Sequence, residues 1–258
     1  VEKVIRLDKQ AHKSDWINRM PRLLYILIAL LFSGPVFSEA SLSPFTLEYN
    51  VSKNDFHLGS NRHELKHLQD DLYLMQAVTK AEGVVALFFS ETVEETSRFR
   101  LVDGKVKPLH YRYHKSGKDP ETFEVDFDYQ AGELRHSLID KIHPLKPIDQ
   151  DLLSFQVAMM IDLQQSVRPL EYRIADKKRI ETYKLIPRGE KVFDTQLGKM
   201  HTVIMEYYDK KRKRTYRFWC AKELGYLPYR SRRIEEDGDI ILLQMRRYNG
   251  KPAEPLEE

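Results

Sequence analysis

Hydrophobic and polar residues alternate one by one over several segments of the chain. In residues 45–51 an apolar side chain occupies every second position, and residues 109–114 and 123–129 follow the same rule. A period of two is typical of a strand that buries one face and exposes the other to water. These segments therefore predict antiparallel strands.

The C-terminal half repeats the pattern, and short turn sequences separate its strands. Asp103-Gly104 and Asp237-Gly238 are strong hairpin signals. Because adjacent strands then pair, we expect a meander. Strands are predicted in the second half at residues 201–208, 215–220, 226–234 and 240–248.

One segment, residues 149–165, has helical rather than alternating periodicity. Asp149 is a candidate N-cap, and Pro147 and Pro169 bracket the segment. So apolar a helix must be buried over much of its circumference, and the sheet is its available partner. The apolar stripe consists of Leu152, Leu153, Phe155, Val157, Met159, Met160 and Ile161.

Two further segments complete the fold prediction. Residues 82–89 form a short apolar run that predicts a central strand, and residues 251–258, rich in proline and glutamate, predict a disordered tail. The regions on either side of the helix form either two sheets or one continuous sheet, and we favour one. The predicted fold is mainly β: a strongly curved, half-barrel-like antiparallel sheet wrapped around one central α-helix.

The N-terminal region has the layout of a secretory signal peptide. Residues 23–32 are an unbroken apolar run, too short to span a bilayer, and small residues follow it. We expect cleavage before Glu39 or Ser41, with Met20 as an alternative start. This divides the chain into residues 1–38 (extension and signal peptide), 39–250 (one β-rich domain) and 251–258 (tail). The predicted location is the periplasm.

Charge and cysteine content narrow the function classes. The chain carries a formal net charge of +3, and residues 1–38 alone account for it, so the remainder is formally neutral. Global charge therefore gives no reason to expect a nucleic-acid partner. The single cysteine, Cys220, cannot form an internal disulfide. A lipoprotein signal requires a cysteine directly after the cleavage site, so we expect no lipid anchor of that kind.

The sequence contains no recognisable catalytic or metal-binding motif. His57, His63 and His67 lack a carboxylate or thiol partner at a known metal spacing. Asp151 and Asp162 are explained by a polar helix face. There is no G-x-S-x-G, S-x-x-K, H-E-x-x-H or Gly-rich phosphate loop. We expect a non-enzyme with no cofactor and no metal.

Five consecutive cations occupy a predicted hairpin turn. Anionic lipid headgroups attract such a turn, whereas its simplest interpretation is a solvated loop tip. The arginines at 230, 232, 233, 246 and 247 fall on adjacent predicted strands and are also explained by a solvated strand face. The candidate membrane or partner contact consists of Lys210, Lys211, Arg212, Lys213 and Arg214.

The order of several short segments resembles the bacterial domain-of-unknown-function family 3108 (DUF3108), whose members are exported envelope proteins. The matching pieces are residues 47–51, 106–111, 125–128, 151–154 and the hairpin from Trp219 to Arg230. The resemblance implies no catalytic residues. The hairpin is also similar to one in Lol-type periplasmic lipoprotein carriers, which implies a half-open sheet that cups a hydrophobic cavity.

These observations lead to a functional hypothesis and two alternatives. We expect a non-catalytic factor that binds a lipid or lipoprotein acyl chain between helix and sheet and touches an anionic membrane surface. The alternatives are an envelope scaffold with a filled core and an envelope hydrolase. The oligomeric state is left open. Seven residues are predicted to line the ligand cavity: Tyr111, Phe123, Phe127, Val157, Met160, Ile161 and Phe218.

Overall fold

The computed structural model describes residues 42–177 and 179–256. The predicted signal peptide and its cleavage site lie outside these residues. No helix in the described part of the chain is long and apolar enough to cross a membrane.

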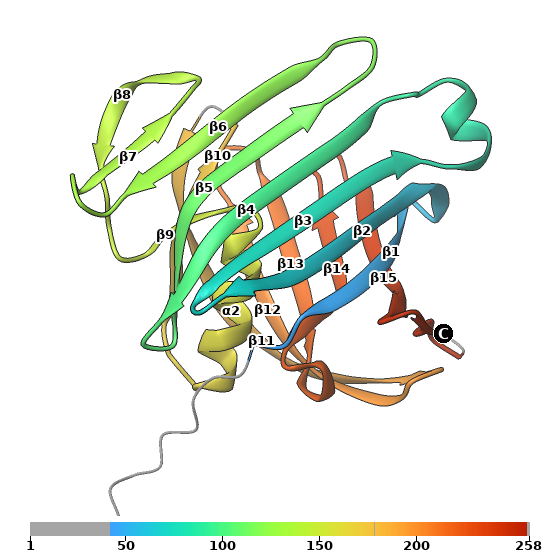
Figure 1. Cartoon of the computed structure of the whole chain (residues 1–258). Helices are drawn as coiled ribbons and strands as arrows, with labels where there is room; N and C mark the ends of the chain where they lie inside the picture. Colours follow the sequence, from blue (N-terminus) through green and yellow to red (C-terminus); the bar gives the residue numbers. More distant parts are fainter. Residues whose placement is uncertain (1–41, 178, 257–258) are drawn as a thin grey trace, which may run out of the picture. The chain divides into compact units, whose positions relative to one another are not determined.

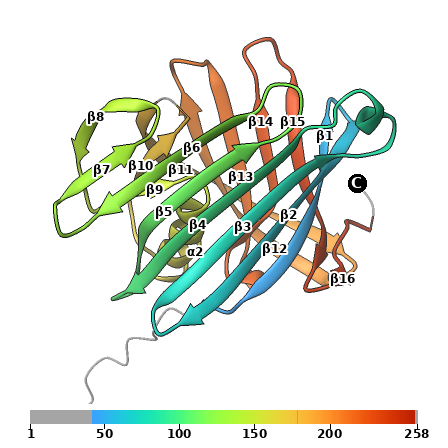
Figure 2. The same ribbon diagram turned by 45° about the horizontal axis from the view of Figure 1, so that its top comes forward.

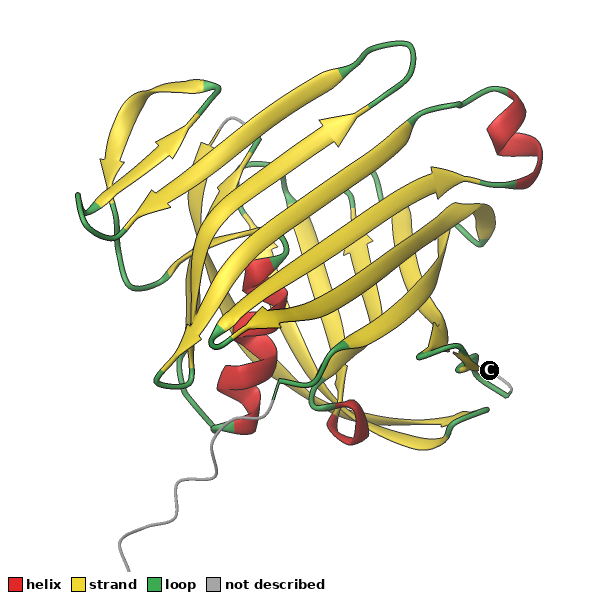
Figure 3. Ribbon diagram, in the orientation of Figure 1, coloured by secondary structure: helices red, strands yellow, loops and turns green. Residues whose placement is uncertain are grey.

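The described unit is mainly β, with one α-helix and two short 3-10 helices (Figure 3). The strands are β1 (Phe45–Lys53), β2 (Phe56–Gln69), β3 (Leu72–Ala81), β4 (Thr92–Val102), β5 (Lys105–Lys115), β6 (Glu121–Asp128), β7 (Glu133–His136), β8 (Ile139–Pro144), β9 (Asp149–Asp151), β10 (Leu170–Asp176), β11 (Arg179–Thr195), β12 (Gly198–Asp209), β13 (Arg214–Ala221), β14 (Leu227–Ile234), β15 (Ile240–Tyr248) and β16 (Lys251–Pro252). The helices are α2 (Ser154–Gln164), η2 (Gly83–Leu87) and η3 (Lys222–Leu224).

All strands belong to one open sheet (Figure 1). Two antiparallel meanders, β1–β8 and β10–β15, join where β1 pairs with β15, and β9 adds a parallel edge beside β10. The path runs from β8 to β9 without closing, so the sheet is not a closed barrel. The expectation of one continuous sheet is confirmed.

The alternating pattern places one side of each strand in the core. In β1, Phe45, Leu47 and Tyr49 are buried and the residues between them are partly exposed. The Asp103-Gly104 turn forms the predicted hairpin between β4 and β5, and both residues have positive φ, 52° and 66°. A two-residue turn with φ above zero at both positions matches the twist of the strands it joins.

Helix α2 is buried around most of its circumference and contacts β4, β5, β9, β10 and β14 (Figure 2). It begins at Ser154, five residues later than predicted. Asp149 is not its N-cap, because residues 149–151 form β9. The reason is tertiary: Arg173 of β10 donates hydrogen bonds to the fully buried Asp149 carboxylate and to the Pro144 carbonyl.

Two further sequence predictions about local structure are wrong. Residues 82–89 are not a central strand: η2 and the residues after it form the exposed connection between β3 and β4. Residues 251–256 are not a disordered tail. They contribute β16, Ala253 is buried, and the Tyr229 hydroxyl donates a hydrogen bond of 3.0 Å to the Ala253 carbonyl.

Because neighbouring strands are antiparallel, their connecting turns gather at two opposite ends of the strands, which we call rims. The η2 rim carries η2, the Asn54-Asp55 turn and the turn between β12 and β13. The Gly104 rim carries the Asp103-Gly104 turn at the opposite end of β4. Figure 1 shows η2 and the β4–β5 turn at opposite ends of the same strand.

Candidate functional site

A carboxylate and a hydroxyl fix the start of α2. Asp151 accepts hydrogen bonds from the backbone N–H groups of Leu153 (2.9 Å) and Ser154 (2.8 Å) and from the Ser97 hydroxyl (2.7 Å). The Ser154 hydroxyl accepts one from the Asp151 backbone N–H (2.9 Å). These bonds satisfy N–H groups that the first helical turn leaves without partners, and they tie α2 to β4 and β9.

A pocket of about 310 Å³ lies beside α2 at the Gly104 rim. This volume is at the lower end of the range for small-molecule sites. Its wall is largely apolar, and its residues come from α2, β5, β9, β10 and the turns near them. The lining residues include Val106, Tyr129, Ile148, Gln150, Ala158, Ile161, Asp162, Val167 and Tyr172.

The polar groups of this pocket form a small network around Asp162. Lys105 pairs with Asp162 at 2.6 Å, and the Tyr172 hydroxyl donates to the same carboxylate at 2.9 Å. Lys107, also a lining residue, lies over the Tyr129 ring at 6.0 Å. Glu171 also lines the pocket and pairs with Lys184 at 3.3 Å. The pocket therefore combines apolar walls with a few polar and charged groups of both signs, which suits an amphipathic ligand.

Gln150 is the most informative lining residue. It is buried, and its Nε2 donates to the Val106 carbonyl at 3.0 Å. Its Oε1 is buried and has no hydrogen-bond partner among the described residues. A buried acceptor left unpaired costs roughly 1–3 kcal/mol. A hydroxyl or amide donor of a bound molecule would remove this cost if the Gln150 side chain turned so that Oε1 reached the surface of the pocket.

The seven residues predicted to line a cavity lie in or against one hydrophobic core. Ile161 lines the pocket beside α2. Phe218 is partly buried and packs edge-on against Phe155, with ring centroids 5.8 Å apart. The remaining five are buried in the same core: Tyr111, Phe123, Phe127, Val157 and Met160.

The sequence prediction missed the polar part of the pocket. The sequence pattern explains Asp162 by a polar helix face and places Gln150 in the helix itself. The available signal was weak: Asp162 interrupts the apolar stripe of α2, and such a position is solvated unless another element supplies partners. Lys105 and Tyr172 supply them here.

A second polar group, Glu95, is partly exposed and lies on the same face of β4 as the buried Ser97, near Asp151. The Tyr111 hydroxyl donates to Glu95 at 2.5 Å. Burial raises the pKa of Glu95 to about 7, aided by the negative charges of Asp151 and Asp176 and opposed by the Tyr111 hydrogen bond. Ser97 donates to a carboxylate rather than to a histidine, so it lacks the base that activates a serine nucleophile.

Most of the predicted basic contact is neutralised by neighbouring carboxylates. Lys211 pairs with Glu181 at 3.1 Å and Arg212 with Asp176 at 3.3 Å. Lys213 and Arg214 also form ion pairs, with Glu236 and Glu235 respectively. Lys210 lies in the same exposed turn. The turn therefore presents far less net positive charge than its sequence suggests.

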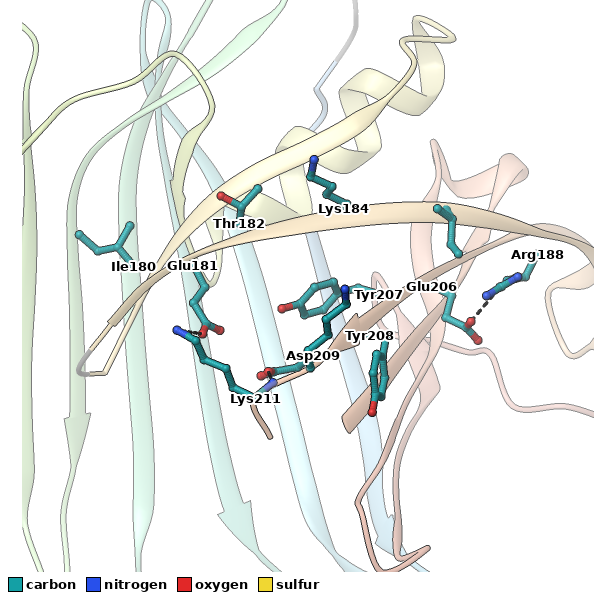
Figure 4. A pocket seen from close by; sticks show the side chains of 12 residues that line it. Ile180, Glu181, Thr182, Lys184, Arg188, Glu206, Tyr207, Tyr208, Asp209 and Lys211 are labelled. Carbon is teal, nitrogen blue, oxygen red and sulfur yellow. Dashed lines mark hydrogen bonds and ion pairs between the residues drawn. The ribbon is translucent and has the colours of Figure 1, made fainter. Parts of the chain in front are cut away.

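Next to this turn, β11 and β12 diverge and leave an open cleft of about 580 Å³ (Figure 4). The two strands pair only from Ile186 and Glu206 onward, while residues 179–185 of β11 pair with β10 alone. Ion pairs Glu181–Lys211 (3.1 Å) and Arg188–Glu206 (2.7 Å) cross the cleft. Tyr207 lines it and stacks on Tyr183 with ring centroids 4.2 Å apart.

Metal ligands do not cluster in residues 42–177 and 179–256: no group of three or more His, Cys, Asp or Glu side chains is placed to hold an ion. His63 is buried against Tyr49, and burial lowers its pKa to about 4. A neutral, buried imidazole of this kind is a packing residue.

Comparisons with known proteins place the chain in a family. No curated protein matches it. Among solved structures, it is similar to the crystal structure of a β-barrel-like protein of domain of unknown function DUF1849 from Brucella abortus, with a TM-score of 0.52 and 11% identity over 81% of this chain and 98% of that one. At this identity the likeness concerns the fold alone. The family model described as protein of unknown function (DUF3108) matches residues 45–245, and the chain belongs to this family.

Proposed function

We propose that this protein binds an amphipathic ligand with an apolar chain, such as a lipid or acyl chain, in the pocket beside α2, and that it is not a catalyst. The observation that carries the proposal is the mostly apolar pocket beside α2, and one of its lining residues, Gln150, has a buried Oε1 without a partner among the described residues. An apolar chain would occupy the wall, and a hydroxyl or amide of the ligand would donate to Gln150.

The polar groups at the pocket suggest how the ligand lies. Lys105 already forms an ion pair with Asp162. Lys107 lies over the Tyr129 ring and has no carboxylate partner among the described residues. We place an anionic or strongly polar end of the ligand near Lys107 and the apolar chain against Ala158 and Ile161.

The proposal extends to the shape of the sheet and to the location of the protein. Contacts of α2 with strands of both meanders, β4 and β5 in one and β10 and β14 in the other, support a half-barrel that curves around the helix, as in the Lol-type carriers that the hairpin resembles. A periplasmic location, after cleavage of the predicted signal peptide, would give such a carrier access to envelope lipids.

The test is binding of a fluorescent fatty acid to delipidated protein. We expect saturable binding by the parent. Ala158→Phe fills the pocket from the helix side and should weaken binding at least about tenfold. Ala131→Phe adds the same bulk in an exposed turn and should bind like the parent. If the parent shows no saturable binding and native mass spectrometry detects no co-purifying lipid, the proposal is wrong.

The role of Gln150 can be tested by comparing two competitors of equal chain length. A fatty alcohol can donate a hydrogen bond to Oε1, and the corresponding methyl ether cannot. We expect the alcohol to compete about tenfold better, corresponding to one hydrogen bond. Gln150→Leu should remove this preference while retaining binding of the ether. Equal preference in parent and variant would contradict the assignment.

A second candidate function, a scaffold for a protein partner, is favoured by the cleft between β11 and β12. Among the described residues, no strand pairs with residues 179–185 of β11 on the side that faces β12. Such an unpaired strand edge can accept an extended peptide. Hydrogen exchange of the amides in residues 179–185, measured with and without envelope extract, would reveal an added strand as slowed exchange.

A further inference from the structure

The connection between β3 and β4 presents a cluster of exposed apolar side chains. We define the apolar tip as Val84, Leu87, Phe88 and Phe89, which are 64%, 80%, 81% and 58% exposed. Figures 1 and 3 show its 3-10 turn at the far end of the β3–β4 hairpin, on the η2 rim. Clusters of this kind on a water-soluble surface mark interaction sites.

The tip has a defined backbone. The Glu82 N–H donates to the Leu58 carbonyl at 3.1 Å, which ties the start of the tip to β2. The N–H groups of Phe88 and Phe89 both donate to the Val85 carbonyl, at 3.0 and 2.9 Å. These bonds hold the backbone in one tight turn. The large side chains lie outside this turn and are exposed to solvent.

The four side chains of the tip are each more than half exposed. Val84 and Leu87 belong to η2, where residues three apart lie on one side, and Phe88 and Phe89 follow its C-terminal end. A folded protein partner would need a matching pocket for each of these separately exposed side chains. Fluid acyl chains can surround all of them at once.

The charge around the tip agrees with a lipid environment. Residues 83–90 contain no charged side chain. Of the two flanking carboxylates, Glu82 pairs with His57 at 3.2 Å and with Arg246 at 3.6 Å, whereas Glu91 has no ion pair among the described residues. The basic turn on the same rim is mostly ion-paired, as described above. Apolar contact rather than attraction to anionic lipid would therefore dominate.

We propose that the apolar tip inserts into the interfacial region of a lipid bilayer and holds the η2 rim against the membrane. Aromatic and leucine side chains are favoured at this depth. The proposal does not depend on the ligand pocket, which lies at the other rim.

The test uses a dye at the tip. Phe88→Cys would be labelled with an environment-sensitive fluorophore, and Cys220 is buried and should not react. With vesicles of phosphatidylcholine alone, we expect a blue shift and increased emission that persist in high salt. The same dye at Ile142→Cys, an apolar position on β8 that is also exposed (50%, against 81% for Phe88), should not respond. An unchanged tip signal, or equal signals at both positions, would overturn the proposal.

A second measurement uses unlabelled protein. Phe88→Ser combined with Phe89→Ser should reduce flotation with the same vesicles at least about tenfold relative to the parent, whereas Ile142→Ser should not. Both variants should bind the fluorescent fatty acid like the parent, which separates this proposal from that of the pocket. Parent-like flotation of the double variant would refute membrane insertion. So would a response of the labelled tip to added protein but not to the vesicles.

Discussion

Replacing Glu95 by Gln should stabilise the protein at alkaline pH and have little effect at acidic pH. Glu95 has a folded-state pKa of about 7, against 4.5 when unfolded. The folded protein therefore holds a proton on Glu95 over this range, while the unfolded chain loses it. As the pH rises from about 4.5, stability is lost progressively, and the full cost is reached above about pH 7.

The size of the effect follows from the two pKa values. A difference of 2.5 between them corresponds to at most roughly 3 kcal/mol, because each pKa unit is worth 1.36 kcal/mol. Glu95 is partly exposed, so solvent screening reduces this value. Gln resembles the protonated acid and can still accept the Tyr111 hydrogen bond. From pH 5 to pH 8 we expect the advantage of Glu95→Gln to grow by about 2 kcal/mol, or about 4–8 °C in Tm.

The assay is thermal unfolding of parent and variant at pH 5 and pH 8. Taking the difference between the two proteins cancels the titrating groups that do not interact with Glu95. Glu94→Gln is the matched control, since Glu94 is the exposed neighbour on the opposite face of β4. A Tm difference that is the same at both pH values, or a variant that is less stable at pH 8, would show that Glu95 does not carry a buried charge.

Three further outcomes are expected. Val157→Asp places an unpaired charge where α2 is fully buried and should cost several kcal/mol, so little folded protein should be recovered, and melting within a few degrees of the parent would contradict the role of the helix. Cys220 should resist thiol reagents until the protein unfolds, because burial raises the pKa of its thiol, and fast labelling of the native protein would contradict this. N-terminal sequencing of the exported protein should begin at Glu39 or Ser41, and retention of residues 23–32 would disprove cleavage.

The sequence predicted the strands well because burial on one face imposes a strict period of two. β1, β5 and β6 begin and end within a few residues of the predicted segments. Residues 82–89 failed for a physical reason: a run of apolar residues looks the same in a buried strand and in an exposed tip. Composition alone does not reveal whether such a segment will be buried in the sheet or exposed at the end of a hairpin.

The start of α2 and the polar part of the pocket could not be predicted for a different reason. Both depend on partners that are distant in the sequence. Asp149 looked like a helix cap, but Arg173 engages it. Asp162 looked solvated, but Tyr172 and Lys105 hold it. Local periodicity contains no information about such pairings, which arise when β10 returns beside β9.

The length of β4 sets the reach of the protein above a surface. Its 11 residues separate η2 from the Asp103-Gly104 turn, a span of about 35 Å at the rise of an antiparallel strand. With the apolar tip seated in a bilayer and β4 upright, the mouth of the pocket beside Gly104 would stand in the aqueous phase, beyond the headgroups. A ligand could not then move sideways into that same membrane. It would be exchanged with whatever approaches from the opposite direction, such as a facing membrane or a second carrier.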